Sequence, residues 1–378
     1  MHAYLNGCHI MEEEILKCLH QCNEVAAIDE VGMLQTFAKA FQTYYTSRMV
    51  YKFEIEYRDD PDTLVKKLSE LKEVSLSSMP VVRASDARYA DVVAREGMGE
   101  RLPSACPLIM QPQAGGGWRK GQIGMVVAAP GAGKSLWLMN EAVAMLREGK
   151  KVVYFALGDL MESDFMERLP AIIHNKLFLE IAQDVETWFD KDETVQALMK
   201  NLRWVVVPAG TVDAYQVRSS IEVQILNEED ADCIIIDYDG NFASKPGTEN
   251  GNMYFAGQEL YNVVSSIARP VGKPYRLVLI ASQPKNGVWE EEYLPLSCAA
   301  ESSKKQHIAD IMVNIGKNGK IRDMGAGIMA IVKNRRGQSN LTGYYIREGT
   351  GRFHFINKLQ YKALGERNNV RDDEDGEG

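Results

Sequence analysis

The distribution of apolar residues changes along the chain. From about residue 106, short runs that are apolar throughout alternate with segments in which apolar residues recur at helical spacing. The runs that predict strands are residues 125–128, 151–157, 202–207, 233–237, 277–282, 311–315, 327–333 and 343–346. Strands that are apolar on both faces, with helices between them, predict a mostly parallel sheet covered by helices on both sides. The expected fold class is therefore α/β.

The N-terminal part follows a different pattern. Apolar side chains over residues 9–74 recur near helical spacing, and the Asp-Asp-Pro-Asp run at 59–62 is typical of a helix start. Residues 76–105 hold one short helical segment between stretches that contain Gly, Ser and Pro. We therefore expect an all-helical N-terminal domain at 1–75, a linker with a short helix at 76–105, an α/β domain at 106–358 and an acidic tail at 359–378.

Composition adds constraints on the class of protein. A chain of 378 residues with 45% hydrophobic and 25% charged residues is typical of a soluble globular protein of about two domains. No apolar run approaches the ~20 residues that a membrane span needs, and the N-terminus lacks a secretory signal pattern. The six cysteines form no close pair of the CxxC type, which fits a reducing cytosol and predicts a cytoplasmic protein.

The formal net charge of −9 argues against a surface that is basic throughout, although basic loops lining a channel remain compatible with it. Part of this acidity lies in the run Arg-Asp-Asp-Glu-Asp-Gly-Glu-Gly at 371–378, which we expect to be disordered. Such a tail either keeps the protein soluble or docks on a basic surface of a partner.

Potential zinc ligands gather near the N-terminus. The cluster consists of Cys8, His9, Cys18, His20 and Cys22. Cys18 and Cys22 share a helix face, but no second close pair supports a zinc site, and ordinary helical positions are the simpler alternative.

The strongest chemical signal is a glycine-rich loop between the first predicted strand and a helix. Residues 128–135 read Ala-Ala-Pro-Gly-Ala-Gly-Lys-Ser, which is the P-loop pattern with Ala128 in place of its first glycine. Backbone N–H groups of such a loop bind phosphate oxygens; the lysine, Lys134, reaches the β- and γ-phosphates, and the Ser135 hydroxyl ligates Mg²⁺. The residues expected to hold ATP are Ala129, Pro130, Gly131, Ala132, Gly133, Lys134, Ser135 and Leu136.

Asp237 ends the predicted strand 233–237, about a hundred residues after the P-loop, where a carboxylate orients Mg²⁺ and its waters. Asp239, two residues later, is a second candidate or a loop carboxylate without a catalytic role. Gln283 follows the strand 277–282 and is expected beside the γ-phosphate, unless it only ends the strand.

Asp159 follows the strand 151–157, whose C-terminal end should face the same crevice. Two interpretations remain open and are compatible with each other. Asp159 polarises the water that attacks the γ-phosphate, or it caps a helix together with Glu162.

A cationic cluster, Lys-Asn-Arg-Arg-Gly at 333–337, ends the strand 327–333. In most packings it would lie far from the P-loop of its own chain. Its functional interpretation is that Lys333 and Arg335 reach the ATP of a neighbouring subunit and stabilise transition-state charge. Its alternative is a solvated basic hairpin.

Together these residues resemble the RecA-like motor domain of DnaB-type replicative helicases, including those of bacteriophages, over about residues 106–356. The segments that carry the resemblance are the glycine-rich lead-in 115–121, the strand 151–157, the Ile-Ile-Ile-Asp-Tyr run 234–238, Ala-Ser-Gln at 281–283, Glu301-Ser302 with Ala309-Asp310, the Lys-x-Arg-x-Gly element 333–337, and Gly-Thr-Gly-Arg-Phe at 349–353. The chain departs from the family after the second strand, where Gly158-Asp159 stands in place of the usual catalytic Glu.

The resemblance implies a ring-forming, ATP- and Mg²⁺-dependent DNA helicase, with a hexamer that moves along single-stranded DNA and with Lys333 and Arg335 acting on the adjacent subunit. It also implies contacts with a primase, a helicase loader or a polymerase. Loops after the strands that end at Asp237 and Ser282 should face the DNA. The lysines there are Lys245, Lys285, Lys304 and Lys305, each of which is otherwise ordinary surface.

Two alternatives share the same motor. A RecA-type recombinase or repair ATPase would form filaments, and the Lys-x-Arg element argues against it. A non-motor ATP-binding regulatory scaffold would have weakened catalysis, which the missing Glu would permit.

Overall fold

The computed structural model describes residues 99–364 apart from 227–230, 243–252, 271–273, 286, 290, 299–302, 317–324 and 348, together with positions 90, 93, 97 and 366. The chain divides into two compact units, Met1–Ala87 and Arg88–Gly378, and the described residues belong to the second. The predicted helical domain at 1–75, its Cys/His cluster and the acidic end of the tail at 371–378 lie outside the described residues. No helix in the described part is both long and apolar enough to cross a bilayer.

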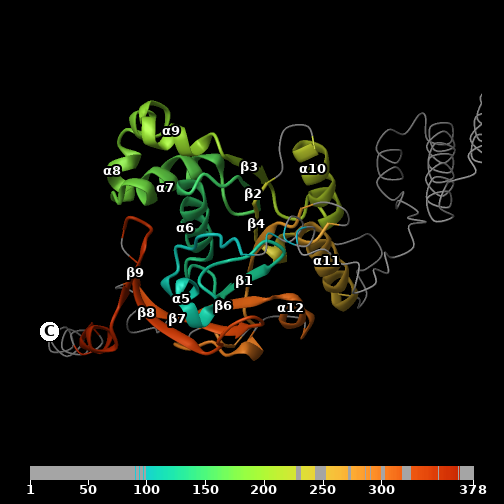
Figure 1. Ribbon diagram of the computed structural model, residues 1–378. Coiled ribbons are helices and arrows are strands. Elements are labelled where there is room, and N and C mark those ends of the chain that lie inside the picture. Colours follow the sequence, from blue (N-terminus) through green and yellow to red (C-terminus); the bar gives the residue numbers. More distant parts are fainter. Residues whose placement is uncertain are drawn as a thin grey trace, which may run out of the picture. The chain divides into compact units, whose positions relative to one another are not determined.

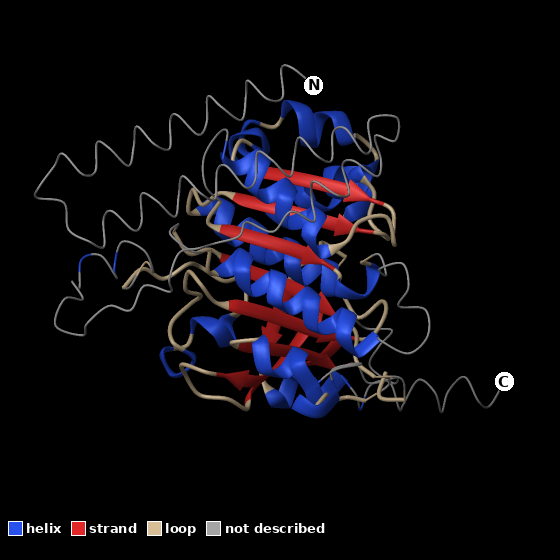
Figure 2. Ribbon diagram, turned by 90° about the vertical axis from the view of Figure 1, so that its right-hand side faces the viewer, coloured by secondary structure: helices blue, strands red, loops and turns tan. Residues whose placement is uncertain are grey.

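Nine strands of the second unit form one sheet in the order β3-β2-β4-β5-β1-β6-β7-β8-β9 (Figures 1 and 2). The strands are β1 (Ile123–Ala128), β2 (Val152–Leu157), β3 (Leu202–Val207), β4 (Cys233–Asp237), β5 (Leu277–Ser282), β6 (Ile311–Gly316), β7 (Ala326–Asn334), β8 (Leu341–Arg347) and β9 (Phe353–Ile356). The first six in spatial order run parallel, and β7, β8 and β9 extend the sheet as antiparallel neighbours.

Helices cover the sheet on both faces, with α6 and α7 on one side and α10 and α11 on the other (Figure 1). The helices are α5 (Pro107–Met110), α6 (Lys134–Arg147), α7 (Glu162–His174), α8 (Phe178–Ala182), α9 (Glu193–Met199), α10 (Ala214–Leu226), α11 (Met253–Ala268) and α12 (Ser303–Ile308). Short turns of other helical types lie at Pro112–Ala114, Glu186–Lys191, Asp239–Asn241 and Leu296–Cys298.

The apolar strands divide their side chains between two cores. In β4, Ile235 packs in the core under α6, whereas Ile234 and Ile236 pack in the core under α10 and α11. The same alternation separates Val126 from Val127 in β1. This is why the central strands read as continuous apolar runs in the sequence.

The predicted α/β class and mostly parallel sheet are confirmed, and each predicted strand is present with bounds within two residues of the expectation. The structure adds β9, which the apolar pattern did not predict. The topology brings the carboxyl ends of β1, β2, β4 and β5 to one edge of the sheet, where α/β folds bind ligands.

Candidate functional site

The P-loop connects β1 to α6. Gly131 and Gly133 have φ values of 69° and 102°, in the left-handed region that favours glycine. Gly133 is the N-cap of α6 and has no side chain to cap the helix. The first-turn N–H groups of α6 therefore face the loop, where they can bind an anion.

Lys134 starts α6, and only 8% of its surface is exposed. Its Nζ donates to the carbonyl oxygens of Ala128 and Ala129 at 3.0 and 3.2 Å. Burial lowers the pKa of Lys134, and the charge of Asp237 opposes this shift. A phosphate oxygen is a stronger partner for an ammonium than a neutral carbonyl, so the position of Lys134 fits phosphate binding.

Asp237 ends β4 and is buried beside the P-loop. Its Oδ2 accepts a hydrogen bond from the Tyr154 hydroxyl of β2 at 2.8 Å. Burial raises the pKa of Asp237, and hydrogen bonds from Ser135 and Tyr154 act against the rise. The adjacent hydroxyl and carboxylate of Ser135 and Asp237 are suitable oxygen ligands for Mg²⁺, which proteins often hold with one or two side chains plus substrate phosphates.

Among the residues that the structure describes, no group of three His, Cys, Asp or Glu side chains could hold a metal ion. Tyr154, which orients the carboxylate, was not predicted, because a tyrosine inside an apolar strand looks like ordinary core.

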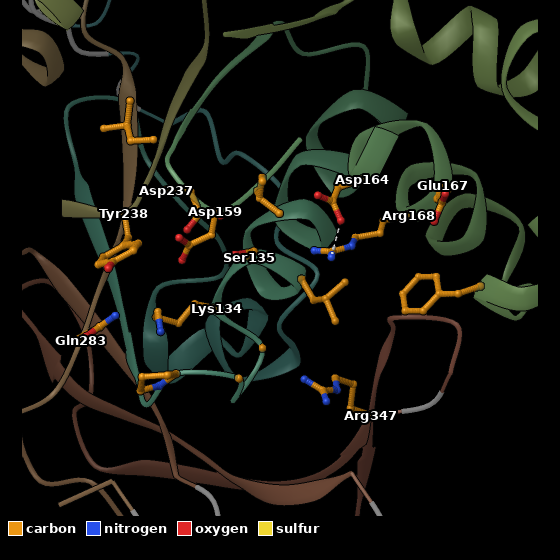
Figure 3. A pocket seen from close by; sticks show the side chains of 17 residues that line it. Lys134, Ser135, Asp159, Asp164, Glu167, Arg168, Asp237, Tyr238, Gln283 and Arg347 are labelled. Carbon is orange, nitrogen blue, oxygen red and sulfur yellow. Dashed lines mark ion pairs between the residues drawn. The ribbon is translucent and has the colours of Figure 1, made fainter. Parts of the chain in front are cut away.

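A cavity of about 430 Å³ opens between the P-loop and the ends of β2, β4 and β5. Lys134, Ser135, Asp159, Asp237 and Gln283, which the sequence analysis assigned to one site, all line it (Figure 3). Tyr238, which follows β4, lies between Asp237 and Gln283 in the same wall.

The C-terminal end of β2 places Asp159 at this cavity, where the side chain is exposed and lies close to Asp237 (Figure 3). The alternative prediction, that Asp159 caps a helix with Glu162, is wrong. Helix α7 begins at Glu162, and the Oδ2 of Asp164 accepts the N–H of Met161 at 2.8 Å. Asp159 is thereby left free of a capping role.

Two arginines that were not predicted also line the cavity. Arg347, at the end of β8, lies against the P-loop: a Cβ added to Gly133 would meet its guanidinium at 2.8 Å. Arg168 on α7 pairs with Asp164 at 2.5 Å (Figure 3). No local sequence signal marks Arg347, because only the folded sheet brings the end of β8 close to the loop that follows β1.

Lys333 and Arg335 do not line the cavity of their own chain. Lys333 donates to the carbonyl oxygens of Gln306 and His307, and Arg335 donates to that of His307. Arg335 also pairs with Asp310 at 3.3 Å. Both cations therefore lie at the C-terminal end of α12, as expected of groups that do not serve their own P-loop.

The lysines predicted to contact DNA are placed differently from one another. Lys285 is exposed just after Gln283, whereas Lys245 and the side chain of Lys304 lie outside the described residues. Lys305 is buried and pairs with Asp239 at 2.8 Å. Because its ammonium is committed to that pair, we do not assign Lys305 to the DNA surface.

The arrangement of the sheet and the P-loop is shared with solved structures. No family model and no curated protein matches the sequence. A solved structure described as an ATPase domain superposes with a TM-score of 0.54 at 15% identity, over 69% of this chain and 94% of that one. "The Structure Of A DnaB-Like Replicative Helicase And Its Interactions With Primase" gives a TM-score of 0.62 at 15% identity, over 86% and 78%.

This protein has a RecA-like P-loop ATPase fold. The fold that the sequence resemblance implied is therefore confirmed. At 15% identity the likeness concerns the fold alone, and function has to be argued from the site.

Proposed function

We propose that this protein is an ATP-dependent DNA helicase of the DnaB type, which hydrolyses ATP at the interfaces of a ring. One observation carries the proposal. The P-loop, Asp237 and Gln283 surround one cavity, whereas the half-buried Lys333 and the exposed Arg335 lie outside it in the same domain. A heterologous interface would bring the two halves together, because in a ring each subunit offers one surface to the next.

Each side chain that the sequence predicted at the cavity then has a role. Lys134 and the N–H groups of the loop hold the triphosphate, and Ser135 and Asp237 hold Mg²⁺, which screens phosphate charge. Asp159 accepts a hydrogen bond from the attacking water and orients it. Gln283 contacts Tyr238 beside this position and is placed to respond to the γ-phosphate.

Lys333 and Arg335 of the neighbouring subunit complete the site by stabilising charge on the transferred phosphoryl group. A cation that one subunit supplies in this way to the site of another is called a finger, and it raises the rate by a factor on the order of 10³–10⁵ in enzymes that use one. The segments after β4 and β5 face single-stranded DNA, with Lys245, Lys285 and Lys304 contacting phosphates. The solved DnaB-like helicase is described with a primase, and a primase, loader or polymerase is the partner class that we propose here.

Strand displacement on a forked duplex tests the proposal. Wild type should hydrolyse ATP faster with single-stranded DNA and unwind the fork, whereas Lys134→Ala and Arg335→Ala should do neither. Arg336→Ala is the matched control, because this exposed neighbour of Arg335 has no assigned role. A wild-type protein that hydrolyses ATP but never unwinds a fork, with or without a loader, would overturn the helicase assignment.

One observation favours a second candidate, a non-motor regulator that binds ATP. Asp159 has a shorter side chain than the Glu that the DnaB family uses, so its reach toward the water is reduced. A regulator would bind nucleotide at this cavity without DNA-stimulated turnover, and the turnover measurement above separates the two.

A further inference from the structure

Helix α12 carries a buried ion pair that the proposed reaction does not use. Lys305 Nζ lies 2.8 Å from Asp239 Oδ2 and donates to Ser282 Oγ at 3.1 Å. The exposed fractions of the Lys305 and Asp239 side chains are 7% and 2%. Asp239 also accepts the hydroxyl of Tyr261 on α11 at 2.6 Å, so the carboxylate has two donors in this network.

The partners of Lys305 adjoin the cavity. Asp239 follows Tyr238 directly, and Ser282 directly precedes Gln283, while Tyr238 and Gln283 are themselves cavity residues. Each of these two cavity residues is therefore one peptide bond away from a group that holds Lys305.

The last turn of the same helix contacts Lys333 and Arg335, the two cations proposed to act on the neighbouring subunit. The carbonyls of Gln306 and His307 accept from Lys333 and Arg335. A helix C-terminus carries partial negative charge, which suits this role. Asp310, just after α12, fixes the guanidinium of Arg335 from the other side and is itself held by Arg269 at 2.6 Å.

We propose that Lys305 is a positioning residue: its buried pair with Asp239 fixes α12, and α12 sets where Lys333 and Arg335 are presented to the neighbouring subunit. The nucleotide state of a subunit's own cavity thereby regulates the positions of the Lys333 and Arg335 side chains that act in the neighbouring subunit's site. The inference rests on the proposed function, because it gives Lys333 and Arg335 their role in the neighbour's site.

A purely structural role would not need charge at this place. Replacing a buried ion pair by apolar groups of similar volume is often neutral for stability, whereas removing one partner leaves a buried charge without its counterion. The double variant Lys305→Met/Asp239→Leu therefore removes the pair while leaving no unpaired charge. The single variant Lys305→Met is expected to melt at a lower temperature than the double variant.

The test compares the effect of Arg335→Ala in two backgrounds, wild type and Lys305→Met/Asp239→Leu, in the assembled full-length protein with single-stranded DNA. If α12 positions Arg335, Arg335→Ala lowers kcat by at least about a hundredfold in wild type and by less than about fivefold in the double variant, where the finger is already misplaced. The double variant itself loses kcat while its KM for ATP stays within about twofold of wild type.

Two outcomes overturn different statements. An equal loss on Arg335→Ala in both backgrounds shows that Lys305 and Asp239 act independently of the finger, and the inference fails while the shared site stands. If Arg335→Ala in the wild-type background has the same kcat as wild type, Arg335 has no role in the neighbouring site, and the proposed function fails at that point. Thermal melting of every variant shows that each is folded.

Discussion

In the proposed reaction, Asp159 is the side chain on which turnover should depend most directly, because it is the exposed carboxylate that faces the cavity at the end of β2. We expect Asp159→Asn to lower kcat by about 10²–10⁴, the usual contribution of general-base catalysis. Nucleotide affinity should change little, since the phosphates are held by the P-loop. Steady-state turnover and titration with a fluorescent ATP analogue separate the two effects.

Asp159→Glu lengthens the side chain by one methylene and should retain turnover, because the carboxylate is kept. Glu162→Gln is the matched control: this exposed carboxylate starts α7 and does not line the cavity. An Asp159→Asn protein as active as wild type would move the water-positioning role to another carboxylate of the cavity, of which Glu167 is the first to test.

Arg347 lies against Gly133 in the loop that we propose holds the phosphates, so its charge should contribute to nucleotide binding within the same chain. A charge-assisted hydrogen bond contributes about 1.5–3 kcal/mol. We therefore expect Arg347→Ala to raise the Kd for ATP by about 10- to 100-fold, and Arg347→Lys, which lacks the planar fork, to recover only part of it.

Calorimetric titration with a slowly hydrolysed ATP analogue measures this change. Lys358→Ala removes an exposed cation outside the cavity and should leave the affinity unchanged. If Arg347→Ala binds as tightly as wild type, the contact with Gly133 only packs the loop.

Local sequence patterns predicted some residues of the site and missed others. Gly131, Gly133, Lys134 and Ser135 were predictable because a P-loop has a short signature that sets both the backbone and its chemistry. The place of Arg347 beside the P-loop and the pairing of Lys305 with Asp239 were not, because each is a contact between distant parts of the sequence, which strand order creates. From the sequence, Lys305 is interpreted as a surface lysine of a DNA-facing loop, because its buried partner Asp239 is far away in the chain.

At the scale of elements, helix α6 is tied to the segment before β1 by one buried carboxylate. Glu141 accepts hydrogen bonds from Ser104 Oγ at 2.8 Å, Trp118 Nε1 at 2.8 Å and Cys106 N at 3.2 Å. Burial raises the pKa of Glu141 to about 7 from an ordinary value of 4.5, and the hydrogen bonds limit the rise.

The raised pKa makes stability depend on pH in a defined direction. Between pH 4.5 and about 7 the folded protein keeps a proton that the unfolded chain has lost. The free energy of unfolding therefore falls as pH rises through this window, by up to about 3 kcal/mol, and this contribution is constant above it. Glu141→Gln cannot titrate, so it should remove this part of the pH dependence.

Urea unfolding at pH 5 and pH 8 measures the difference. The stability of Glu141→Gln relative to wild type should rise by about 2–3 kcal/mol from the lower to the higher pH. Glu148→Gln, an exposed carboxylate at the end of the same helix, should follow wild type. Parallel profiles of Glu141→Gln and wild type would mean that Glu141 is ionised in the folded protein across this range.

The elements also show where the apolar pattern was sufficient. Strands that are buried on both faces, such as β4 and β5, were predicted at their observed bounds because every position is apolar until the polar residue that ends the strand. β9 was missed because its four half-buried residues give no such run. Its place in the sheet comes from pairing with β8.

At the scale of the whole molecule, the proposed site is divided between subunits, and mixing two inactive variants tests that division. Lys134→Ala subunits lack the P-loop lysine but keep Arg335, and Arg335→Ala subunits have the reverse defect. In a ring with heterologous interfaces, an equal random mixture joins both intact halves at about a quarter of the interfaces. Turnover should therefore reappear on mixing, at roughly that fraction of the wild-type rate per subunit.

A site contained within one chain gives a different result, because every subunit in the mixture then carries one defect. No recovery would be expected at any mixing ratio, provided that subunits exchange. Exchange is checked with differently labelled wild-type chains under the same conditions. Recovery that follows the product of the two subunit fractions, with its maximum at equal amounts, is the signature of Lys134 and Arg335 meeting across an interface.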